Sequence, residues 1–139
     1  MNLVRSTVTF HDPCRLGRQM GVYDEPRDLI NAVEGVELVE MEHHGEDAMC
    51  CGVSSMMSCN ENARSLRVTR MEEVRATGAE TMLTSCPKCV SHFECLKFEG
   101  DEAYQDIEIL DVVSFLARQV NEKKAQIGAE ATVSGTVEA

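Results

Sequence analysis

The sequence contains no tryptophan and few other aromatic residues, and its charged residues are mostly acidic. Aromatic side chains make up only 4% of the chain, so methionine and aliphatic residues must fill the interior. The formal net charge is −11 at pH 7. Nucleic acids and anionic membranes both require a cationic binding face, and we therefore exclude them as the main partners of this protein.

Long apolar stretches are missing as well. None approaches the roughly 18 residues that a membrane-spanning helix requires, so we expect no insertion into a membrane. The segment beginning at Met1 lacks the apolar run of a signal peptide, which predicts a cytoplasmic protein. A chain of 139 residues has the length of one domain. It is long enough to bury a core without the help of disulfides.

Strand and helix signals alternate along the chain. The sequence predicts strands over residues 3–10, 36–41, 81–84 and 107–110. Helices are predicted between and after them: from Asp24 to Gly35, from Asn60 to Thr77, from Cys86 to Phe98, and from Asp111 onwards. This alternation indicates a single α/β domain, with a parallel sheet of about four strands and helices on both faces.

Apolar positions indicate which helix faces are buried. The helix from Asn60 has only a loose apolar face, at Ala63, Leu66, Met71 and Val74. The last helix has a clear stripe at Val112, Leu116 and Val120. We place the domain at residues 1–124, because residues 125–139 are rich in Gly, Ala, Ser and Thr and are predicted to form a disordered tail.

Seven cysteines are the most informative feature of the sequence. Their odd number and the expected cytoplasmic location favour metal or redox chemistry over structural disulfides. Five of them follow predicted strands: Cys14, Cys50, Cys51, Cys86 and Cys89. Because the carboxyl ends of parallel strands meet at one edge of a sheet, we expect these five cysteines to lie at one rim.

The local sequence around these cysteines suits metal binding. Cys50 and Cys51 are adjacent and hence poor partners for a disulfide, but two neighbouring thiolates can bind one metal centre. Pro87 begins a helix, which places Cys86 and Cys89 at its positive end and favours their thiolate forms. A multi-iron centre carries enough positive charge to offset five thiolates. Gly52 allows the chain to pass close to such a centre.

The segments HDPCRLGR, YDEPRDLI, GVELVEME, CCG and SCPKC together resemble the cysteine-rich CCG domain. This domain occurs in the B and D subunits of heterodisulfide reductases and in related iron–sulfur oxidoreductase subunits. Its pattern of one cysteine, then Cys-Cys-Gly, then Cys-x-x-Cys falls on Cys14, Cys50-Cys51-Gly52 and Cys86 with Cys89. The resemblance implies that these five cysteines hold a noncubane [4Fe–4S] cluster.

The same resemblance has implications for function. It implies an iron–sulfur redox domain that couples electron transfer to disulfide or thiol chemistry, with a disulfide or thiol as substrate. It also implies that other iron–sulfur subunits or domains of a redox complex are partners. The chain would then be a subunit or domain of a heterodisulfide-reductase-like oxidoreductase, and not a complete enzyme alone.

The residues themselves leave alternatives open. A zinc ion needs only four thiolates, which would make the chain a structural docking module of a larger oxidoreductase. The segment TMLTSCPKC also fits the strand, Cys-x-x-Cys and helix of thioredoxin-like proteins, but it leaves Cys14, Cys50 and Cys51 without a role. The five cysteines can also be buried thiols without a ligand. Of the remaining two, Cys59 is a reserve ligand, whereas we expect Cys95 to pack as a small apolar residue.

Several polar residues lie beside the cysteine motifs. His11 and Asp12 precede Cys14, and we expect them either to be turn residues or to supply a proton when a thiolate leaves. Lys88 lies inside the Cys-x-x-Cys segment. It is either a surface charge or a cation that attracts an anionic substrate.

Overall fold

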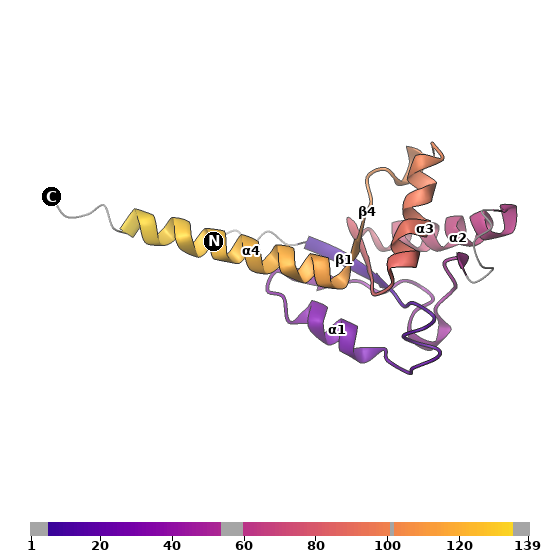
Figure 1. Cartoon of the computed structure of the whole chain (residues 1–139), viewed down its shortest axis with the longest axis horizontal. Coiled ribbons are helices and arrows are strands. Elements are labelled where there is room, and N and C mark those ends of the chain that lie inside the picture. Colours follow the sequence, from indigo (N-terminus) through magenta and orange to yellow (C-terminus); the bar gives the residue numbers. More distant parts are fainter. Residues whose placement is uncertain (1–5, 54–59, 101, 135–139) are drawn as a thin grey trace.

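The computed structural model of the protein describes residues 6–53, 60–100 and 102–134 (Figure 1). Strands and helices alternate throughout the chain. They are β1 (Ser6–His11), α1 (Asp24–Asn31), β2 (Val36–Leu38), α2 (Glu61–Thr77), β3 (Thr81–Thr84), α3 (Pro87–Phe98), β4 (Glu108–Asp111) and α4 (Val112–Ser134).

The four strands form one parallel sheet with the order β2-β1-β3-β4. At its carboxyl edge, His11 of β1 pairs with Thr84 of β3, and Thr84 pairs with Asp111 of β4. The chain moves outward from β1 to β2 and then crosses back to β3, so the direction of winding reverses between β1 and β3. This topology confirms the predicted α/β fold with a four-stranded parallel sheet.

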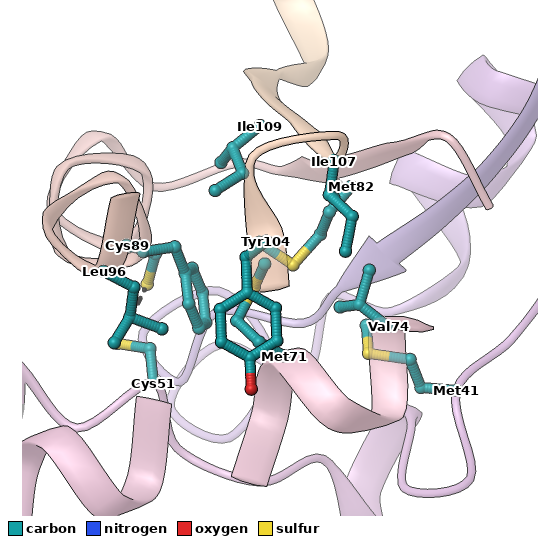
Figure 2. Close-up of a cluster of buried hydrophobic side chains, with 11 residues drawn as sticks. Met41, Cys51, Met71, Val74, Met82, Cys89, Leu96, Tyr104, Ile107 and Ile109 are labelled. Atoms are coloured by element: carbon teal, nitrogen blue, oxygen red, sulfur yellow. Dashed lines mark hydrogen bonds between the residues drawn. The ribbon is translucent and has the colours of Figure 1, made fainter. Parts of the chain in front are cut away.

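Helices cover both faces of the sheet and create two apolar cores. On one face, α2 and α3 contribute Met71, Val74, Phe93 and Leu96 to a core that also contains Met82 of β3 (Figure 2). On the other face, α1 and α4 pack over the second core, which contains Val8, Phe10, Ile30, Leu83, Val112 and Phe115. Neighbouring residues of the two central strands, Thr9 and Phe10 in β1 and Met82 and Leu83 in β3, are all fully buried, so these strands are covered on both sides.

Helix ends follow the local sequence rules. The Asn60 side chain accepts a hydrogen bond from the Ala63 backbone N–H at 2.9 Å and caps α2, as predicted. Gly78 ends α2 in the left-handed conformation. Pro87 begins α3 with Cys86 as its N-cap residue, and an Asp111 carboxylate oxygen accepts from the N–H of Val113 at the start of α4. These caps fix where the cysteine-bearing connections begin and end.

Several details differ from the sequence-based expectation, and one is that α1 ends at Asn31 and not near Gly35. β2 ends at Leu38, three residues before the predicted end at residue 41. In α2, Leu66 is exposed, whereas Arg67 and Arg70 are fully buried because polar groups inside the protein accept their hydrogen bonds. In α4, Val120 is 52% exposed, because the helix extends beyond the sheet that buries its first turns (Figure 1).

The helix α4 continues to Ser134 and therefore includes residues that the sequence assigns to a disordered tail. Residues 121–131 of this helix are all exposed. The domain boundary at residue 124 stays a prediction. Within the described residues, no helix combines the length and the apolar composition needed to cross a membrane.

Candidate metal centre

Three connections carry the five cysteines that the sequence singles out. Cys14 follows β1, and Cys86 and Cys89 lie at the N-cap and the third residue of α3, which follows β3. Cys50 and Cys51 lie after the short 3-10 helix Gly45–Asp47, in the connection between β2 and α2. All five line one cavity of about 200 Å³. The cavity adjoins the point between β1 and β3 where the winding reverses, which is the usual position of a ligand crevice in open α/β sheets.

Cys51 and Cys89 form the buried part of this site. Their exposed fractions are 4% and 3%, and the Cys89 thiol donates to the Cys51 sulfur across 3.4 Å. Figure 2 shows the two cysteines together, on the opposite side of the core from Met41. The hydrogen bond from Cys89 lowers the pKa of Cys51, and a hydrogen bond with His11 lowers it further. The bond with Cys51, together with burial, raises the pKa of Cys89. Cys51 is therefore the thiolate of the pair, which is the form that binds metal ions.

The other three cysteines are more accessible. Cys14 is exposed, and Cys50 and Cys86 are half-buried. The backbone N–H of Gly52 donates to the Cys50 sulfur at 3.2 Å. Cys86 lies at the N-terminus of α3, where the helix dipole favours negative charge. The site thus has a buried side at Cys51 and Cys89 and an open side at Cys14.

His11 and two buried arginines surround the cysteines, and sequence reasoning missed the two arginines. His11 was expected in a turn, but it is the last residue of β1 and is 1% exposed. Its ring lies against Cys51 and Cys89, and one ligand atom from each of the three residues lies within 4.8 Å of the other two. Arg67 and Arg70 are fully buried on α2. Their spacing of three residues, on the helix face that also carries Met71 and Val74, is the sequence signal that could have identified them.

Ion pairs hold two of the cysteine loops together. Arg27 of α1 binds both carboxylate oxygens of Asp12, at 2.8 and 2.7 Å, and also binds the carboxylate of Glu40. Asp12 in turn accepts a hydrogen bond from the Gly45 N–H at 2.8 Å. Asp12 therefore connects the loop of Cys14 with the segment that leads to Cys50.

Gly52 adopts a conformation that requires glycine. Its φ angle is +95°, and a Cβ atom there would lie 2.6 Å from the Ala63 carbonyl oxygen and 3.2 Å from Nε2 of His92. A left-handed conformation costs a residue with a side chain roughly 1–2 kcal/mol, and a contact this close to the backbone adds to that cost. The chain can pass between the cysteines and α2 only because this residue lacks a side chain.

We expect Gly52→Ala to lower the free energy of unfolding by about 2 kcal/mol, measured by urea titration of the metal-free, reduced protein. Gly78→Ala is the matched control, because Gly78 also has a positive φ of +72° but has open space around its Cβ position. The control should lose only about 1 kcal/mol, which is the cost of the left-handed backbone alone. Equal losses in the two variants would contradict a steric role for Gly52.

A second cavity adjoins the first. It has a volume of about 250 Å³ and shares Pro13, Cys14 and Cys50 with the cysteine-lined cavity. Arg18 lines the second cavity and donates to the Ala48 carbonyl oxygen at 3.2 Å, while Lys88 lines the first. Each cavity therefore has at least one cation in its wall, and Arg15 is a second cation in the wall of the first.

Of the two remaining cysteines, the structure describes only Cys95. Cys59, the reserve ligand of the sequence analysis, lies outside the described residues. Cys95 is half-buried on α3, and the described residues that line the cavity do not include it.

The fold and the cavity define an α/β domain built around a cluster of thiols. The chain also matches the CCG family, described as a cysteine-rich domain, over residues 8–94. The protein therefore belongs to the CCG cysteine-rich domain family. This match confirms the resemblance that the cysteine pattern indicates.

Longer proteins contain similar sequences. The chain is 37% identical over 124 residues to the probable iron–sulfur-binding oxidoreductase FadF of Bacillus subtilis, which covers 84% of this chain and 17% of FadF. It is 34% identical over 114 residues to the D subunit of the dihydromethanophenazine:CoB–CoM heterodisulfide reductase of Methanosarcina acetivorans, covering 81% and 27% of the two chains. It is 35% identical over 119 residues to the B subunit of the fumarate reductase (CoM/CoB) of Methanothermobacter marburgensis, covering 84% and 23%.

The chain thus spans less than a third of the length of each of these relatives. Its domain is shared with iron–sulfur oxidoreductases and with one chain of a heterodisulfide reductase, and this relationship supports an iron–sulfur redox domain.

Proposed function

We propose that this protein is the iron–sulfur redox domain of a heterodisulfide-reductase-like oxidoreductase. In this proposal, a noncubane [4Fe–4S] cluster is held by the five cysteines that line the cavity: Cys14, Cys50, Cys51, Cys86 and Cys89. The observation that carries the proposal is this one cavity, to which three separate connections contribute sulfur. Membership of the CCG family supports the same conclusion.

The residues of the cavity fit such a cluster. Thiolate sulfur is the ligand that iron–sulfur clusters take from proteins, and the cavity has five such donors. A structural zinc ion needs four ligands, so one cysteine would be left over. A thioredoxin-like site would use only Cys86 and Cys89 and would leave three sulfurs of the same cavity without a role. Gly52 contributes space, because it lacks the Cβ atom that would collide with Ala63.

When bound, the cluster supplies electrons singly for the reduction of a disulfide, which takes up two electrons and two protons to give two thiols. The chain's own residues prepare the site for such a substrate. The second cavity shares Cys14 and Cys50 with the first, so a substrate there lies beside two of the ligands. Arg18 and Lys88 provide positive charge in the walls of an otherwise acidic protein and favour an anionic substrate.

The names and lengths of the related proteins indicate which partners this chain needs. Two of them are named as reductase subunits, and the chain corresponds to less than a third of each. We therefore propose that electrons reach this domain from iron–sulfur clusters of other subunits or domains in a redox complex, and that the chain does not turn over alone.

Metal analysis of protein purified without oxygen tests the proposal. We expect about four iron and four sulfide ions per chain and visible absorption that a chelator abolishes. The chelator-treated protein serves as the baseline. One zinc ion per chain without iron would contradict the proposal and identify the domain as a structural docking module instead.

A further inference from the structure

His11 is held rigidly beside the cysteines. It is 1% exposed, at the end of β1. Its ring packs edge-to-face against Phe93 of α3, with 5.1 Å between the ring centroids and 80° between the planes. The ring can therefore neither leave the site nor rotate without disturbing the core.

Arg70 reaches His11 from α2. Its Nε atom donates to Nδ1 of His11 at 2.9 Å, and the whole arginine side chain is buried. The other end of the guanidinium is fixed as well, because it donates to the His43 carbonyl oxygen at 2.6 Å and to the carboxylate of Glu73. The position of the Nε donor is thus set by three partners on different parts of the chain.

This contact decides where the proton of His11 is. Arginine has only hydrogen-bond donors, so Nδ1 of His11 must be the acceptor and carries no hydrogen. A neutral imidazole then carries its hydrogen on Nε2. A ring nitrogen of His11 lies within 4.8 Å of the Cys51 sulfur and forms a hydrogen bond with it, and Nε2 is the ring nitrogen that Arg70 leaves available. His11 therefore donates an N–H to the Cys51 sulfur and does not offer it a lone pair.

We propose that Arg70 is a positioning residue of the metal centre: it fixes the His11 tautomer whose Nε2–H donates to the Cys51 sulfur. Hydrogen bonds to ligand sulfur withdraw electron density and raise the reduction potential of an iron–sulfur centre. Arg70 thereby makes the centre easier to reduce without touching it. This last step rests on the proposed function, whereas the tautomer belongs to the protein with or without iron. The same reasoning excludes His11 as a metal ligand through Nε2.

The tautomer is tested first, in the unaltered protein. Nitrogen-15 NMR of the metal-free, reduced full-length chain distinguishes a protonated ring nitrogen from an unprotonated one. We expect the two-bond correlations of His11 to show hydrogen on Nε2 and none on Nδ1. Hydrogen on Nδ1, or on both nitrogens, would overturn the proposal. This measurement needs no variant and no iron, so its failure is separate from a failure of the proposed function.

Two matched variants then test Arg70 itself. Arg70→Lys keeps the positive charge but removes Nε, and Arg67→Lys makes the same change at the other fully buried arginine of α2, which binds the His92 carbonyl oxygen and Glu99. We expect Arg70→Lys to give a mixture of His11 tautomers and Arg67→Lys to keep the single one. An unchanged tautomer in a folded Arg70→Lys variant would overturn the proposal. If Arg70→Lys does not fold, the proposal is tested by the His11 tautomer of the unaltered protein, and hydrogen on Nδ1 overturns it.

The reduction potential of the metal centre is measured in the iron-loaded protein. At a fixed solution potential, we expect Arg70→Lys to lower the ratio of reduced to oxidised centre about tenfold. For a one-electron couple this is a shift of about 59 mV to more negative potential. The Arg67→Lys protein should titrate like the unaltered protein. Equal shifts of the reduction potential in the two variants would show that Arg70 acts only as a structural cation. They would contradict its role in positioning His11.

Discussion

Cys51→Ser is expected to abolish iron binding. A serine hydroxyl stays protonated at neutral pH, and its hard oxygen is a poor substitute for the soft thiolate that iron–sulfur clusters require. Cys51 is also the buried thiolate to which both Cys89 and His11 are hydrogen-bonded, so neighbouring residues are arranged around its sulfur. Iron and sulfide per chain, measured after anaerobic purification, should fall to the level of the chelator-treated protein.

Cys95→Ser provides the control for this experiment. Cys95 lies on the same domain and is half-buried, but it does not line the cavity that contains the other described cysteines. We therefore expect its iron content to match that of the unaltered protein. If both serine variants retained the same amount of iron, the assignment of Cys51 as a ligand would be wrong.

The largest loss of stability is expected for Arg27→Met. Arg27 forms ion pairs with Asp12 and Glu40, donates to the Tyr23 carbonyl oxygen at 2.7 Å, and lies over the ring of Phe10. The Asp12 side chain is only 3% exposed, so the variant leaves a buried carboxylate without its cation. Breaking a buried pair in this way costs about 3–5 kcal/mol. Urea unfolding of the metal-free, reduced protein measures the change in free energy.

Arg118→Met is the matched control. Arg118 also binds a carboxylate with two hydrogen bonds, to Glu108 at 3.0 and 2.8 Å, but both side chains are more than 40% exposed. Exposed pairs of this kind contribute less than about 1 kcal/mol, because water and salt screen them. A similar loss in the two variants would show that burial of Asp12 does not decide the strength of the Arg27 pair.

Arg27→Met should also affect the metal centre. Asp12 holds the backbone of Gly45 through a 2.8 Å hydrogen bond, and it immediately precedes the turn of Cys14. Without Arg27 this connection loosens, and we expect the variant to bind iron less completely even under conditions where it is folded. The ion pair therefore supports the site as well as the fold.

Local rules predicted much of the fold. Asn60, Gly78 and Pro87 mark helix ends in the structure as they do in the sequence, because capping depends on a residue and its near neighbours in the chain. The family could also be predicted from the cysteine spacing, and the family match confirms it. Whether the five cysteines act as ligands stays a proposal that the metal analysis tests.

Burial of individual side chains could not be predicted in the same way. Val120 fits an apolar stripe but is exposed, since α4 has left the sheet at that point. Arg70 would be placed on the surface by its charge, yet it is buried because the Nδ1 atom of His11, the Glu73 carboxylate and a carbonyl oxygen surround it. His11 and Arg70 are separated by 59 positions in the chain, and no local pattern connects them.

The sequence by itself determined the alternation of strands and helices, the caps at Asn60, Gly78 and Pro87, and the cysteine pattern that identifies the family. These depend on the type of a residue and on its distance along the chain. Only the tertiary structure decided which cysteines are buried, which arginine contacts the histidine, and which nitrogen of that histidine accepts the arginine's hydrogen bond. The physical reason is that hydrogen bonds and desolvation depend on distances of a few ångströms between groups far apart in sequence, and packing of both helix layers against the sheet sets those distances.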